Sequence, residues 1–166
     1  AVDPLDQRGA QSLDAVGAGL VHRLAGGDVV ADLRRLQWTE RDLDRLHAEA
    51  GDIDLAVLNA ALPGSGDVME YSVEQMDRAL DVNLRAPMVS ARVLGEGMAQ
   101  RGRGHLVFIA WVAGKLSMGG TAIYSATKFG MRGFALGLRD DLRPRGVGVS
   151  TLFPGFIRDA GMFVNS

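Results

Sequence analysis

Leu55-Ala56-Val57-Leu58 is a continuous apolar run that ends at Asn59. An uninterrupted apolar run of this length is typical of a strand that is buried on both faces of a parallel sheet. Residues 106–109 show the same pattern, and residues 29–31 show a shorter version of it. Val147–Leu152, which is apolar except for Ser150 and Thr151, is a further candidate for a buried strand. The sequence therefore predicts a sheet of buried, parallel strands.

Helical patterns alternate with these strands. They cover four stretches: residues 6–16, residues 39–51, a stretch that starts at Ser72, and residues 124–143. Ser72 and Gln75 have capping-box spacing, their helix carries Asn83, and Pro87 is expected to kink that helix or to start a new one. The alternation predicts an α/β fold, a doubly wound parallel sheet of the Rossmann type with helices on both faces.

The composition fits a single globular domain over residues 1–166. The chain is 47% apolar and 23% charged, and its net charge of −2 gives no footprint for nucleic acid or an anionic membrane. It has no cysteine and three widely separated histidines, so no metal site is predicted. No apolar stretch is long enough to span a membrane, and the first residues do not form a signal peptide, so we expect a cytoplasmic protein.

Tyr124 and Lys128 open the last helical stretch, four residues apart. On a helix this spacing puts both side chains on one face. An ammonium group beside a phenol favours the phenolate, so the pair can donate and accept a proton. Because Tyr and Lys also fall four apart by chance on many helices, the pair alone indicates little.

Further motifs set this pair in context. They are Leu58-Asn59-Ala60-Ala61, Asp81-Val82-Asn83-Leu84, the strand at residues 104–109, and Pro154-Gly155-Phe156-Ile157. Asn59 and Asn83 are 24 residues apart, and Asn83 and Tyr124 are 41 apart. In these motifs, in their order and in their spacing, the chain resembles the short-chain dehydrogenase/reductase (SDR) family over almost its whole length.

The resemblance implies an oxidoreductase that transfers a hydride between NAD(P)(H) and an alcohol or ketone. In that role Tyr124 is the general acid/base, Lys128 lowers its pKa and holds the cofactor ribose, and Asn83 holds a water in the proton relay. Judged from the residues alone, Asn83 could instead satisfy backbone groups at a helix irregularity.

The resemblance also implies cofactor contacts at the ends of the strands. They fall on Asp3, Asp32, Leu33, Asn59, Ala60, Tyr124, Lys128, Pro154, Gly155 and Ile157. Asp3 would accept hydrogen bonds from the adenosine ribose and repel a 2′-phosphate, which favours NAD over the alternative, NADP. Asp32 is expected at the adenine amino group, but an N-cap role fits it as well, Asn59 could be a turn residue, and Asp3 could be a solvated charge.

Trp111 departs from the family pattern. It stands 13 residues before Tyr124, where relatives place a catalytic Ser. An indole N–H can only donate and fills space that a substrate needs, and the loss of one such hydrogen bond typically slows a reaction by about 10²–10³. Asp159 is a second departure, since relatives usually have Thr there. A second hypothesis is therefore an SDR-like binding or assembly module without turnover.

The two ends also depart from the pattern. No apolar first strand with a Gly-rich turn is visible, and Ala1-Val2-Asp3 is best placed at the end of the family's second strand. The chain stops before the family's substrate lid and last strand. We therefore expect a Rossmann-like domain that is incomplete at both ends and belongs to a longer SDR domain.

The substrate and the assembly are predicted only in outline. An apolar pocket mouth, formed by Trp111, Met118, Phe156 and Met162, would favour a hydrophobic alcohol or ketone. In relatives two helices pack against their copies in a second subunit. The second of them carries Phe129, Met131, Phe134, Leu138 and Leu142, which span more of the helix than one core stripe needs. We therefore expect a homodimer or homotetramer.

Overall fold

The computed structural model describes residues 19–23, 27–31, 52–59, 61–62, 64 and 66–155, and the single residues 41, 44 and 48. Its strands are β1 (Gly19–Arg23), β2 (Gly27–Ala31), β3 (Leu55–Leu58), β4 (Gly104–Ile109) and β5 (Val147–Leu152). Its helices are η1 (Val68–Glu70), α3 (Val73–Leu80), η2 (Asp81–Arg85), α4 (Ala86–Arg101), η3 (Val112–Gly114), α5 (Ala122–Leu142) and η4 (Arg143–Arg145). None of the helices in these ranges is long and apolar enough to cross a membrane. Arg41, Asp44 and Ala48 are helical, in agreement with the helix predicted at 39–51, whereas the helix predicted at 6–16 lies outside the described residues.

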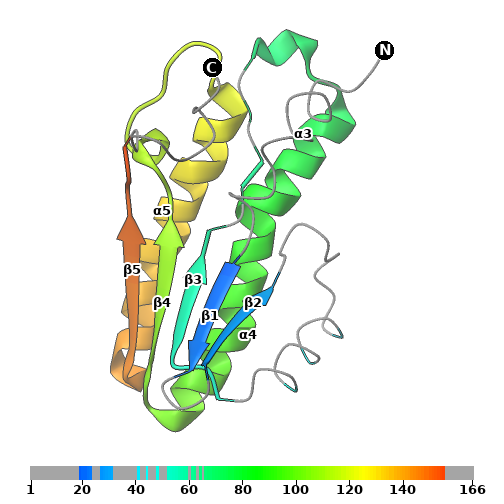
Figure 1. Cartoon of the computed structure of the whole chain (residues 1–166). Coiled ribbons are helices and arrows are strands. Elements are labelled where there is room, and N and C mark those ends of the chain that lie inside the picture. The colour runs from blue at the N-terminus through cyan, green and yellow to red at the C-terminus, as the bar shows by residue number, and fades with distance from the viewer. Residues whose placement is uncertain are drawn as a thin grey trace.

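The five strands form one sheet in the order β2-β1-β3-β4-β5 (Figure 1). β3, β4 and β5 are parallel, as predicted, with Leu58 opposite Phe108 and Phe108 opposite Thr151. Alternate residues of these strands are buried, among them Leu58, Phe108 and Val149, because both α4 and α5 pack on that face of the sheet. The parallel half of the predicted Rossmann-like sheet is therefore confirmed, with the described long helices on one face.

β1 and β2 differ from the prediction of an all-parallel sheet. β1 is antiparallel to both of its neighbours, with Gly19 opposite Ala31 and Leu20 opposite Val57. Only three residues separate β1 from β2, and a parallel connection needs a dozen or more. The predicted strand at residues 29–31 exists as β2, but it belongs to an antiparallel pair whose other strand the sequence patterns did not indicate.

One helical run contains α3, η2 and α4 in succession. The predicted capping box starts it: Gln75 N donates to Ser72 Oγ at 3.2 Å, and Ser72 N donates to Gln75 Oε1 at 2.8 Å. Pro87 has no N–H to offer the carbonyl of Asn83 four residues earlier, and its ring crowds that carbonyl. The chain responds with the π-helical turn η2, in which Ala86 N donates to Asp81 O. The expected disturbance at Pro87 therefore appears as an extra-wide turn that includes Asn83.

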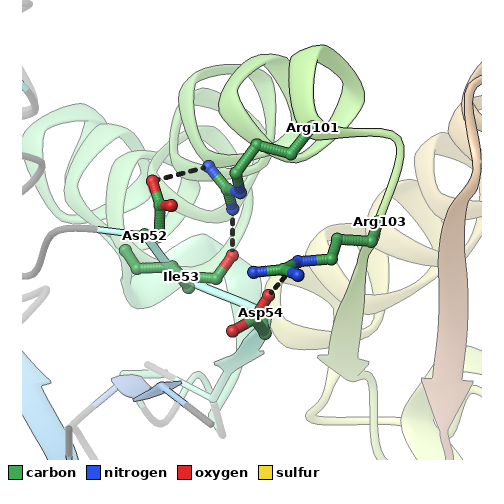
Figure 2. A network of polar contacts seen from close by, with 5 residues as sticks. All are labelled: Asp52, Ile53, Asp54, Arg101 and Arg103. Atoms are coloured by element: carbon green, nitrogen blue, oxygen red, sulfur yellow. Dashed lines mark hydrogen bonds and ion pairs between the residues drawn. The ribbon is translucent and has the colours of Figure 1, made fainter. Parts of the chain in front are cut away.

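Polar contacts fix the opposite end of the parallel strands (Figure 2). Arg101, at the end of α4, lies 3.4 Å from an Asp52 carboxylate oxygen and donates to Ile53 O at 2.5 Å. Arg103 Nε donates to Asp54 Oδ1 at 3.2 Å. These contacts hold the start of β3 against the turn between α4 and β4.

Candidate active site

The carboxyl ends of the three parallel strands lie at one edge of the sheet. Asn59 follows β3, Trp111 comes two residues after β4, and Pro154 comes two residues after β5. Ligands of open α/β sheets bind outside this edge. The first turns of α5, with Tyr124 and Lys128, belong to the same region, because η3 after β4 packs against α5.

Tyr124 and Lys128 lie on one face of α5, as their spacing predicts, and both are buried, at 7% and 1% exposed. The Lys128 ammonium lies 5.5 Å from the centre of the Tyr124 ring and donates to the carbonyl of Ile109 at 3.1 Å. The Tyr124 hydroxyl is also buried, and no group of the described residues is hydrogen-bonded to it. The pair thus includes a buried hydroxyl whose hydrogen-bonding capacity is not used within the described residues.

Burial dominates the proton affinities of this pair. It raises the pKa of Tyr124 well above its ordinary value, and it lowers the pKa of Lys128 to about 8. Both shifts favour the neutral form, since burial penalises charge. The expected lowering of the Tyr124 pKa by Lys128 is not the dominant effect here, because burial of the phenol itself raises the pKa.

Asn83 lies in η2 and is fully buried. Its Oδ1 accepts from Leu62 N at 2.6 Å, and its Nδ2 donates to Leu62 O at 2.9 Å. The amide therefore satisfies backbone groups next to a helix irregularity, which is the structural role that the residue alone suggested. Because Pro87 has no N–H, it cannot donate a hydrogen bond to the backbone carbonyl of Asn83.

Trp111 adopts φ 56° and ψ 168°, and it has the only positive φ of a non-glycine residue among the described residues. Its neighbours are held in place, since Ala110 N donates to Leu152 O at 2.9 Å and Val112 N donates to Pro154 O at 3.0 Å. Gly114 N also donates to Trp111 O at 3.0 Å. A positive φ is a genuine outlier for a bulky residue and typically costs about 1–3 kcal/mol. Trp111 is 8% exposed, so its side chain is buried.

The remaining predicted site residues are only partly placed. Asn59 and Pro154 are half-buried and Gly155 is exposed at the carboxyl edge. Met118 is 68% exposed, and its N–H and carbonyl both bond the Thr121 hydroxyl. The other predicted contacts lie outside the described residues: Asp3, Asp32, Leu33, Ala60, Ile157, and with them Phe156, Asp159 and Met162.

Backbone groups of two residues at the site were not predicted. These are the Ile109 carbonyl that accepts from Lys128 and the Leu62 peptide that binds Asn83. Backbone groups carry no residue-type signal, so the sequence offered nothing that could have found them.

The geometry agrees with comparisons to known proteins. The sequence profile described as "short chain dehydrogenase" matches residues 13–166. The chain therefore belongs to the short-chain dehydrogenase/reductase family, whose members are NAD(P)-dependent oxidoreductases with a Rossmann-like fold.

Individual relatives agree with this assignment. The chain is 31% identical to the ketoacyl reductase HetN of Nostoc sp. over 95% of its own length and 54% of HetN. It is 30% identical to human dehydrogenase/reductase SDR family member 4 over 94% of the chain and 68% of the human protein. A metagenomic short-chain oxidoreductase in complex with NADP superposes with a TM-score of 0.65 at 30% identity, covering 70% of this chain and 53% of that structure. The chain thus spans only about half the length of several proteins that it matches.

Proposed function

We propose that the protein containing this chain transfers a hydride between NAD(P)(H) and an alcohol or ketone, with Tyr124 as the general acid/base. One observation carries the proposal. The Tyr124 hydroxyl is buried at the carboxyl edge of the parallel strands without a partner from the described residues. A buried hydroxyl without a hydrogen-bond partner lowers the stability of the folded protein. Its presence is explained if a substrate oxygen supplies the missing hydrogen bond.

The chain's own groups suggest how a proton would move. Tyr124 would give its proton to the developing alkoxide, or take it from the alcohol. Lys128 would supply positive charge beside the phenol ring, and it would hold the cofactor ribose after leaving the Ile109 carbonyl. Since the Asn83 amide is bonded to Leu62, Asn83 would serve the relay through its backbone carbonyl, which can hold a water.

Several residues fit a dinucleotide at this edge. Asn59, Tyr124, Lys128, Pro154 and Gly155 would contact it. A Cβ on Gly155 would meet nothing within 4 Å, so this backbone is open to a close ligand. When bound, the nicotinamide would supply or accept the hydride. Asp3, Asp32, Leu33, Ala60 and Ile157 complete the proposed set. Asp3 argues for NAD, and the NADP complex of a related structure argues for NADP, so both cofactors belong in the test.

Trp111 favours a second candidate, a binding or assembly module without turnover. The indole replaces the hydroxyl that would share the substrate oxygen with Tyr124, and the backbone is strained to place it. The intact pair of Tyr124 and Lys128 favours catalysis. We rank an oxidoreductase in the cytoplasm that acts on a hydrophobic alcohol or ketone first, with Trp111 and Met118 at its substrate pocket.

The outer surfaces of α4 and α5 fit a homodimer or homotetramer. A groove of about 680 Å³ between the helices is lined by apolar and oppositely charged side chains: Met88, Val89, Arg92, Glu96, Phe134, Leu138, Asp141 and Arg145. Phe129 and Leu136 are more than 40% exposed, and a Cβ on Gly133 or Gly137 would meet nothing within 4 Å. A second copy would bury these apolar side chains and approach the glycines closely.

Binding and turnover separate the two candidates. NADH and NADPH fluorescence would be titrated with the full-length protein, and reduction of apolar ketones would then be followed at saturating cofactor. Binding with turnover that Tyr124→Phe abolishes supports the enzyme. Binding without turnover supports the module, and turnover that survives Tyr124→Phe excludes the assigned role of Tyr124.

A further inference from the structure

The segment between β3 and α3 lies against the start of α5, close to Tyr124. A Cβ built on Gly64 would lie 3.2 Å from both Tyr124 Cβ and Tyr124 N. This is tighter than most Cβ contacts, so a side chain at position 64 would require Tyr124 or the segment to shift by a few tenths of an ångström. Gly64 therefore packs directly on the residue that carries the unpartnered hydroxyl.

A hydrogen bond joins the same segment to the loop before α5. Gly66 N donates to Gly120 O at 2.8 Å. Gly66 has φ 144° and Gly120 has φ 75°, conformations that residues with a side chain rarely adopt. Gly120 directly precedes Thr121, whose carbonyl accepts from Ser125 N at 2.8 Å in the first turn of α5. The bond thus connects the β3–α3 segment to the start of the helix that carries Tyr124.

Side chains fix both partners of this contact. Asn83 holds Leu62, two residues before Gly64. On the other side, the Thr121 hydroxyl bonds Met118 O at 2.8 Å and the Ser125 hydroxyl at 3.0 Å. Because hydrogen bonds hold each of the two segments in place, their contact has a defined position relative to Tyr124.

We propose that Gly64, Gly66 and Gly120 are positioning residues for Tyr124, which hold the β3–α3 segment against the first turn of α5 and so keep water from the Tyr124 hydroxyl. The catalytic meaning of this proposal rests on the proposed function, but the shielding itself does not. A dry hydroxyl gives its proton only to a bound partner, because no water competes for it. These glycines would then decide whether Tyr124 meets solvent or only substrate.

Tyrosine nitration tests the shielding without cofactor or substrate. The chain has two tyrosines, Tyr71 and Tyr124, so nitration by tetranitromethane at pH 8 can be measured for each by peptide mass spectrometry. Gly120→Ala adds strain at φ 75°, while its Cβ would come no closer than 3.9 Å to the nearest atom, Gly66 O. We expect nitration of Tyr124 to accelerate roughly fivefold in this variant, in line with the strain of one left-handed alanine. Gly64→Ala should accelerate it as well, by pushing the segment off Tyr124.

Two glycines provide matched controls. Gly119→Ala changes the adjacent residue, which has open space and no positive φ, and should leave the rate unchanged. Gly102→Ala adds similar strain at φ 69° with open space, at the far end of the domain, and reports any general loss of stability. Unchanged nitration in both Gly120→Ala and Gly64→Ala would overturn the proposal, as would equal acceleration in Gly102→Ala. If the protein turns over substrate but nitration is unchanged in the variants, only the shielding proposal is refuted. If nitration accelerates as expected but the protein shows no turnover, only the proposed function is refuted.

Discussion

The side-chain amide of Asn83 and the peptide of Leu62 form a closed pair of hydrogen bonds across 21 residues of sequence. One partner lies in the π-helical turn η2, and the other lies in the segment that leaves β3 toward Tyr124. Both groups of the Leu62 peptide are thereby satisfied in a buried environment. The position of the site therefore depends on a residue that need not touch a substrate with its side chain.

Asn83→Ala should lower the free energy of unfolding by roughly 2–4 kcal/mol, because it leaves a buried N–H and a buried C=O without partners. Urea denaturation measures this change. Ser90→Ala is the matched control, since the Ser90 hydroxyl is also buried but bonds only to Ala86 O within its own helix. If Asn83→Ala lowers the free energy of unfolding no more than Ser90→Ala does, the hydrogen bonds between Asn83 and Leu62 do not contribute the expected stability.

Lys128 should make stability depend on pH. Its pKa is about 8 in the folded protein and about 10.4 when unfolded, so between these values only the unfolded chain keeps the proton. Stability therefore rises with pH in this window. The difference in free energy of unfolding between wild type and Lys128→Met should shift by roughly 2 kcal/mol from pH 7 to pH 9.5 in favour of wild type. Lys115→Met, at the only other and exposed lysine, should show no such shift.

Tyr124→Phe should separate stability from activity. It removes a buried hydroxyl without a partner in the described residues, so the melting temperature should stay the same or rise. Turnover should fall to background while NAD(P)H binding is retained. A clear drop in melting temperature would show that the hydroxyl has a structural partner after all.

Trp111→Ser should raise turnover by roughly 10²-fold, the typical effect of one hydrogen-bond donor to a developing oxyanion. Trp111→Gly relieves the positive φ but supplies no hydroxyl, so it serves as the control for strain and space. Steady-state rates at saturating cofactor compare the two. If both variants are faster than wild type by the same factor, the gain comes from the removal of the bulky indole or of the strain and not from the hydroxyl. If neither variant is faster than wild type, the indole does not limit turnover.

Phe134→Glu should dissociate the proposed dimer or unfold the chain, because Phe134 lines the groove and also meets the Phe108 ring edge-on, with centroids 5.9 Å apart. Phe129→Glu separates these outcomes, since Phe129 is 42% exposed and can carry a charge in a folded monomer. Met69→Glu, at a residue that is 87% exposed and belongs to η1 rather than to α4 or α5, is the control. Light scattering that finds wild type monomeric at micromolar concentration would refute the assembly.

The parallel strands, the capping box and the Tyr124 helix could be predicted from sequence because each has a local signal. Residues 106–109 form a continuous apolar run, and Ser72 with Gln75 has a fixed spacing. β1 could not be predicted, because Gly19–Arg23 is short, contains His22 and Arg23, and is a strand only through its pairing with β2 and β3.

The same distinction applies to the site. Tyr124 and Lys128 could be chosen by type and spacing, and helix geometry predicted that they share one face of α5. Asn83 could be chosen through its place in a motif that resembles the family's. The direction of the pKa shift of Tyr124 could not be predicted, since it depends on how strongly the surrounding segments bury the phenol. The strained backbone of Trp111 depends on hydrogen bonds to β5 and the turn after it, more than 40 residues away.

The π-helical turn also restricts changes in the length of the chain. Asp81–Arg85 holds about one residue more than an α-helical turn, which offsets the screw phase of α3 from that of α4 by about 100°. Deleting one residue there would turn Val82 or Leu84 toward Leu62 in place of Asn83. Substitutions on the outside of this turn should therefore be tolerated far better than any insertion or deletion within it.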